Sequence, residues 1–172
     1  RARVLETYKR MPNGANVAFY EQGALSFDQV AACTVQPKKR GVGTVDVIVS
    51  THEGMPGEEL LEEIQDYFDQ RREIAVDVLV KAPEADPVNV AASIEVAGGW
   101  DGMVVTAAVR KAVQEFFSGE RLSGPILVAQ LNQLIFTTPG VANCTVTAPA
   151  ADVPAVAGTL PTLGTLTAEV AE

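Results

Sequence analysis

Hydrophobic and polar residues alternate at two places in the first half of the chain. Valines occupy every second position from Val45 to Val49 and again from Val76 to Val80, and the other face carries polar residues such as Asp46, Ser50, Asp77 and Lys81. A period of two places alternate side chains on opposite faces of a strand, so both segments are predicted strands. Residues 29–36 are a third predicted strand, and a basic, glycine-containing turn over residues 37–43 joins it to the next.

A helical period separates the last two of these strands. Apolar residues recur three or four positions apart between Glu58 and Arg72, which predicts an amphipathic helix. Its apolar stripe consists of Leu60, Leu61, Ile64, Tyr67 and Phe68. Glutamates lie in the first turns and two arginines at the end, as the helix dipole favours. Two shorter helices are predicted upstream, one over residues 1–10 and one that Asn16 caps and that runs towards Ala24.

The second half of the chain repeats this mixture of strands and helices. Asp101 is a suitable N-cap for one helix, and Pro125 suits the first position of another. In order, the predicted elements are a strand over 88–96, helices over 101–118 and 125–138, a strand over 141–147, a loop over 148–163 and a strand over 165–170.

This order of elements predicts an α+β protein. We expect two small subdomains, each a short mixed or antiparallel sheet covered by one or two helices. An N-terminal helical segment should span residues 1–26, the first subdomain residues 27–84 and the second residues 85–172. The boundary is predicted at Pro83–Pro87, where two prolines interrupt the pattern.

Composition and charge narrow the classes of partner. Hydrophobic residues make up 47% of the chain and its mean hydropathy is +0.14, so we expect a packed core. No apolar run approaches the roughly 20 residues that cross a bilayer. Because the formal charge is −9, nucleic acid and anionic membrane surfaces should be repelled. We therefore expect neither a nucleic-acid nor a membrane partner.

Residues that could carry chemistry are few. His52 is the only histidine; with Glu53 it could form an acid–base pair or begin a metal site, but an exposed turn is the simpler interpretation. Cys33 and Cys144 lie far apart in predicted strands, so we expect reduced, buried thiols. Gly41-Val42-Gly43 lacks the third glycine of a dinucleotide site. We expect no catalytic residue, no metal and no cofactor.

The helix over residues 58–72 carries the one candidate contact face. Glu59, Glu62, Glu63 and Asp66 fall at helical spacing opposite the apolar stripe. Solvent exposure is the ordinary explanation for such a face. The functional alternative is that these carboxylates meet a basic surface on a neighbouring subunit. Unpaired strand edges are the other resource that this fold would offer for contact.

Several motifs occur in a specific order between residues 12 and 96. They are Pro12-Asn13-Gly14, Phe19-Tyr20, Val30 to Pro37, Gly41-Val42-Gly43-Thr44-Val45, Pro56-Gly57-Glu58-Glu59-Leu60-Leu61, Arg71-Arg72 followed by Val76-Asp77-Val78, and Pro87-Val88-Asn89-Val90. With Leu122-Ser123-Gly124-Pro125 and Pro139-Gly140-Val141, this order resembles the baseplate J-like family. That family comprises baseplate wedge proteins of Mu-like and P2-like contractile phages and of related injection systems.

The resemblance has two departures. Many family members carry a tryptophan shortly after the aromatic position at Tyr20, where this chain has Gln22 and Gly23. The family's N-terminal region is also missing, and the chain begins at Arg1 without an initiator Met, so we expect a piece of a longer polypeptide.

The resemblance implies a structural protein that joins wedges around the tail hub and has no catalytic residues. Its expected partners are other baseplate, wedge and tail hub proteins, and the isolated piece should be monomeric or weakly self-associating. The expected location is the virion tail baseplate, after assembly in the bacterial host cytoplasm. Two alternatives remain open: a receptor- or glycan-binding tail module that uses the loop over 148–163, and a hydrolase accessory domain that uses His52.

Overall fold

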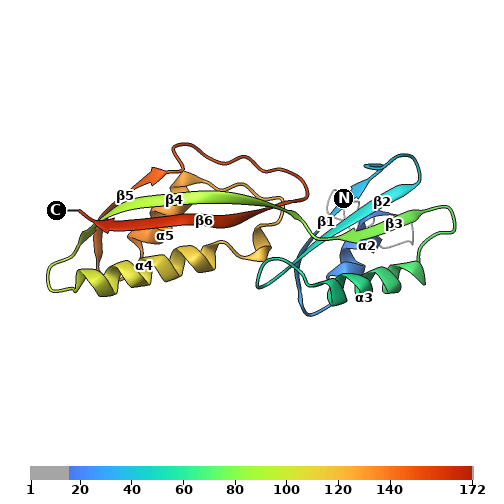
Figure 1. The fold of residues 1–172 in the computed structure, drawn as a ribbon, viewed down its shortest axis with the longest axis horizontal. Coiled ribbons are helices and arrows are strands. Elements are labelled where there is room, and N and C mark those ends of the chain that lie inside the picture. The colour runs from blue at the N-terminus through green and yellow to red at the C-terminus, as the bar shows by residue number, and fades with distance from the viewer. Residues whose placement is uncertain (1–15, 172) are drawn as a thin grey trace, which may run out of the picture. The chain divides into compact units, whose positions relative to one another are not determined.

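The computed structural model describes residues 16–171, which form two compact units (Figure 1). The first unit contains residues up to Glu84 and the second begins at Ala85. Each holds one three-stranded mixed sheet with helices, so the predicted α+β class is confirmed. The helix predicted over residues 1–10 lies outside the described residues.

The first unit surrounds a sheet in the order β1-β2-β3. Its elements are α2 (Val17–Ala24), β1 (Val30–Pro37), β2 (Thr44–Thr51), α3 (Glu58–Asp69) and β3 (Asp77–Lys81). β1 runs antiparallel to β2, whereas β2 and β3 are parallel, with Val45 opposite Val78 and Val47 opposite Val80. Because parallel neighbours need a crossover, α3 connects β2 to β3 and packs on the sheet.

The core of the first unit confirms the predicted apolar stripe of α3. Leu60, Ile64 and Phe68 are buried against valines of β2 and β3, and α2 adds Tyr20 and Ala24. The N-cap of α2 is Asn16, as predicted, because its side chain accepts a hydrogen bond from the Phe19 N–H at 3.0 Å. Gly23 is required by packing, since a Cβ there would lie 2.7 Å from the Phe68 ring.

Residues 38–40 form an exposed turn, as predicted, but Arg40 also makes ion pairs that the sequence did not predict. Its guanidinium lies 2.6 Å from a carboxylate oxygen of Asp46 and 2.5 Å from one of Asp77. Lys81 reaches the other oxygen of Asp46 at 2.9 Å. Asp46 is fully buried, so these two cations compensate a carboxylate that the sheet has removed from water.

The end of α3 also differs from the prediction. The helix ends at Asp69 instead of Arg72. The two arginines lie in the following turn, where Arg71 stacks over the Tyr67 ring at 4.1 Å and Arg72 pairs with Asp69 at 2.8 Å. These contacts reach back to the last helical turn, so the cations still lie near the negative end of the helix dipole.

The second unit has the sheet order β5-β4-β6. Its elements are β4 (Glu84–Val96), α4 (Gly102–Phe116), the short 3₁₀ helix η1 (Gly119–Arg121), α5 (Val128–Phe136), β5 (Val141–Ala148) and β6 (Thr159–Val170). β5 pairs antiparallel with β4, whereas β6 runs in the same direction as β4 on its other side (Figure 1).

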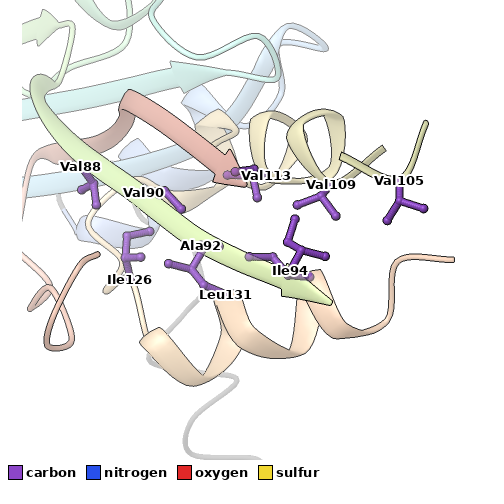
Figure 2. Packing of buried hydrophobic residues seen from close by; sticks show 11 residues of the cluster. Val88, Val90, Ala92, Ile94, Val105, Val109, Val113, Ile126 and Leu131 are labelled. Atoms are coloured by element: carbon purple, nitrogen blue, oxygen red, sulfur yellow. The ribbon is translucent and has the colours of Figure 1, made fainter. Parts of the chain in front are cut away.

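One face of β4 carries the core of the second unit. Every second residue from Val88 to Ile94 is buried, and these side chains pack against α4 and α5 (Figure 2). α4 contributes Val105, Val109 and Val113, and α5 contributes Leu131 and Ile135. The predicted N-cap of α4 is confirmed, because the Asp101 side chain accepts a hydrogen bond from the Met103 N–H at 2.7 Å.

Three boundaries in the second unit were predicted wrongly. β4 already begins at Glu84, so Pro87 lies inside a strand; the residues of β4 that pair with β5 begin only at Ala91, so Pro87 lies outside that pairing. α5 begins at Val128 and not at Pro125, because Ile126 exchanges backbone hydrogen bonds with Val153 at 3.0 and 2.9 Å. The predicted loop is shorter than expected, since β6 already begins at Thr159.

Candidate functional site

The acidic face of α3 lies where the sequence predicted it. We use this name for Glu59, Glu62, Glu63 and Asp66, whose side chains are all exposed. They occupy the side of α3 opposite Leu60, Ile64 and Phe68, which are buried. Among the described residues, no ion pair joins any of the four carboxylates to a cation. The charge of this face is therefore available to a partner.

A groove that sequence reasoning missed runs between α3 and the edge strand β3. It encloses about 450 Å³ and is lined by Leu61, Glu62, Gln65, Asp66, Val78, Leu79 and Val80. Glu62 and Asp66 belong both to the groove and to the acidic face, while Leu79 is 39% exposed. This combination of carboxylates and apolar surface suits a cationic side chain with an apolar stem. One feature of the sequence could have indicated this groove. The alternation of residues in β3 places Leu79 on the face away from the core.

The candidate pair His52–Glu53 lies in an exposed turn after β2. Two hydrogen bonds between the backbones of Thr51 and Gly54, each 2.9 Å long, close this turn. His52 and Glu53 contribute to a surface hollow of about 400 Å³ that Leu60 and Met55 also line. Within residues 16–171 no group of three or more His, Cys, Asp or Glu side chains is arranged to hold a metal ion.

Both cysteines are free thiols, and each is half-buried where full burial was predicted. Burial raises the pKa of Cys33 on β1 to about 12, and the nearby Glu21 carboxylate adds to this shift. Burial also raises the pKa of Cys144 on β5, whose thiol lies 3.5 Å from the Asn132 carbonyl oxygen. Thiolates are scarce at neutral pH in both places, which disfavours nucleophilic chemistry.

The loop that joins β5 to β6, the candidate receptor contact, is tied to the second unit at both ends. Asp152 accepts a hydrogen bond from the Val128 N–H at 2.8 Å and so caps α5. The N–H of Gly158 donates to the Ser123 hydroxyl, also at 2.8 Å. With the pairing of Val153 to Ile126, these bonds give the loop a defined path.

A second surface that the sequence did not predict lies at the start of α4. Met103 and Val104 are 84% and 60% exposed, and Val170 at the end of β6 is 46% exposed. A hollow of about 480 Å³ runs along Met103, Ala107 and Val170. Nearby, Gly140 has a φ of +90°, and a Cβ there would lie 2.6 Å from Val105. The apolar surface therefore rests on a tightly packed corner.

The length and hydrophobicity of the helices were also compared with those of membrane-spanning helices. In the part of the chain that the structure describes, no helix is long and apolar enough to cross a membrane.

Comparison with known proteins finds one family for both units. The model of the baseplate J-like central domain matches residues 12–82, and that of the baseplate J-like C-terminal domain matches residues 88–169. No curated protein matches the chain.

The fold is similar to that of a solved baseplate protein. A chain in the cryo-EM structure of the anti-feeding prophage baseplate superposes with a TM-score of 0.63 at 11% sequence identity. The match covers 89% of this chain but only 38% of the prophage chain. The two tandem family matches thus agree with the fold, and the predicted resemblance is confirmed: the chain belongs to the baseplate J-like family and comprises its central and C-terminal domains.

Proposed function

We propose that the chain is a structural component of the baseplate of a contractile phage tail or a prophage-derived injection machine. The observation that carries the proposal is the pair of tandem baseplate J-like matches over residues 12–82 and 88–169. In this role the chain joins wedge and tail hub proteins through protein–protein contacts and has no catalytic task. Assembly takes place in the host cytoplasm, a reducing compartment that suits two free thiols.

The acidic face of α3 is the contact surface that the geometry favours. Its four carboxylates are exposed and have no cationic partner among the described residues, so a basic surface on a neighbour gains attraction without first breaking an internal ion pair. The adjoining groove adds apolar area at Leu61 and Leu79. Exposed charges at the edge of an interface influence the rate of association and the choice of partner more than they increase the affinity.

Reversal of the acidic face tests this role. Glu59, Glu62, Glu63 and Asp66 are all changed to Lys, which leaves the buried stripe of α3 intact. We expect a folded protein whose incorporation into baseplates falls, because attraction to a basic partner becomes repulsion. Incorporation is measured by quantitative mass spectrometry of purified particles assembled at low and high salt.

A matched variant controls for net charge. Asp28, Glu53, Glu84 and Glu169 are exposed acidic residues away from the acidic face, and their reversal to Lys changes the net charge equally. This control should be incorporated like the unmodified chain. Equal incorporation of the two variants at both salt concentrations would remove the acidic face from the proposal and leave other surfaces to make the contacts.

A further inference from the structure

Gln65 of α3 bonds the backbone of the edge strand β3. Its side-chain oxygen accepts a hydrogen bond from the Val80 N–H at 2.8 Å, and its side-chain nitrogen donates to the Val78 carbonyl at 3.0 Å. Successive strand residues point their backbone groups to opposite sides, and the Asp77 N–H points towards β2, where it donates to the Gly43 carbonyl at 2.8 Å, so the groups of Val78 and Val80 face away from β2. β3 is the last strand of its sheet, so no strand pairs on that side. The amide thus takes one donor and one acceptor that a fourth strand would use.

The orientation of this amide is determined by its surroundings. The Gln65 nitrogen also donates to a carboxylate oxygen of Asp69 at 3.1 Å. A flipped amide would place its oxygen against the Val78 carbonyl and the Asp69 carboxylate, and its N–H against the N–H of Val80. Asp69 is in turn held by Arg72 at 2.8 Å. The amide is therefore positioned before any partner arrives.

The second unit contains a related arrangement. The side-chain oxygen of Asn132 on α5 accepts a hydrogen bond from the Val146 N–H on β5 at 3.2 Å, while its nitrogen donates to the Val128 carbonyl of its own helix. β5, like β3, is a terminal strand of its sheet. In each unit, a helical amide side chain satisfies the backbone of a terminal strand.

Unpaired strand edges are templates on which further chains add. We infer that Gln65 closes the β3 edge to strand addition, so that this edge cannot pair with β3 of a second copy and the groove beside it receives side chains only. The general expectation that strand edges offer contact named no strand, and the inference concerns the β3 edge alone. It rests on the two hydrogen bonds of Gln65 and holds whether or not the acidic face contacts a partner.

Substitution of Gln65 in the full chain tests the inference. Gln65→Met keeps a long, unbranched side chain of good helix propensity but removes both hydrogen bonds, and Gln65→Ala also removes the packing. Gln70→Ala is the control, because Gln70 is exposed at the end of the same helix. Amide hydrogen exchange at Val80 and sedimentation over a range of concentrations are measured for each variant.

At low concentration, Val80 exchange should become about two- to tenfold faster in both Gln65 variants, as expected for the loss of one hydrogen bond. At high concentration both should form dimers in which Val80 is protected again, because two β3 edges then pair. Gln70→Ala should behave like the unmodified chain. Unchanged Val80 exchange in Gln65→Met, or variants that stay monomeric at every concentration, would overturn the inference; so would a Val80 amide that is already unprotected in the unmodified chain.

Discussion

At the scale of single residues, Asp46 shows how this small fold accommodates a buried charge. Its carboxylate is fully buried on β2 and is held between Arg40 and Lys81. Burial raises the pKa of Asp46, but the hydrogen bonds from Arg40 and Lys81 outweigh this effect and bring the pKa below its usual value of 3.8. Since Arg40 also binds Asp77, the cluster joins the turn after β1 to the start of β3.

A carboxyl whose pKa is lower in the folded than in the unfolded state stabilises the fold above its unfolded pKa. This contribution should be complete above about pH 4 and should disappear as the pH falls through the lowered folded value. Asp46→Asn should remove it and reduce the free energy of unfolding of the first unit by about 2–4 kcal/mol at neutral pH, because two cations lose their buried partner. Urea unfolding from pH 7 to pH 2 measures both effects.

The control for this prediction is Asp28→Asn, which alters an exposed carboxyl. It should unfold like the unmodified chain at every pH. If Asp46→Asn lost no stability at neutral pH, or if the difference from the unmodified chain were the same at pH 2 as at pH 7, the ion pairs would not stabilise the fold in the way described.

At the scale of elements, α3 supports both the core and the surface of the first unit. Ile64 is fully buried between Leu60 and Phe68, one turn away in either direction, while Glu63 beside it is exposed. Ile64→Asp should cost more than about 4 kcal/mol, since it removes core packing and buries an unpaired charge. We expect the first unit to unfold while the amides of β4 stay protected from hydrogen exchange.

Glu63→Ala is the neighbouring control and should change stability by less than about 0.5 kcal/mol. Hydrogen exchange resolved by residue distinguishes the two units. An Ile64→Asp chain that retained protection in β2 and β3 would show that α3 does not hold the core of the first unit together.

Elements with a strong local period could be predicted from the sequence. The apolar stripe of α3, the alternation of β2 and the Asn16 and Asp101 caps depend on residues a few positions apart, and each was confirmed. The start of α5 could not be predicted, because Ile126 pairs with Val153, which lies beyond β5 in the chain. Long-range pairing here overrides the preference of proline for the first helical turn.

The candidate site also has one part that the sequence predicts and one part that it does not. The exposure of the acidic face follows from helical periodicity alone, so its four residues could be named from the sequence. The groove and the bonds of Gln65 require α3 to lie beside β3, and the salt bridge between Arg40 and Asp77 joins residues 37 positions apart. No local pattern contains this information.

At the scale of the whole molecule, the chain consists of two small units that each cover one sheet with helices. Its exposed features include the acidic face with its groove in the first unit and the exposed apolar residues around Met103 in the second. Such surfaces fit a part that is held in place by several neighbours. The chain spans 38% of the prophage baseplate protein whose fold it resembles.

The central claim is that this chain is a structural part of a baseplate. Electron microscopy of intact particles tests it most directly. Particles are purified from cells that produce the chain from its native locus with a small tag inserted in the loop between β5 and β6, and the tag is labelled with an antibody fragment. We expect label at the baseplate, at the tail end distal to the head or sheath cap, and density there that fits the two α+β units. Label elsewhere on the particle, or complete baseplates from which the chain is absent, would contradict the account.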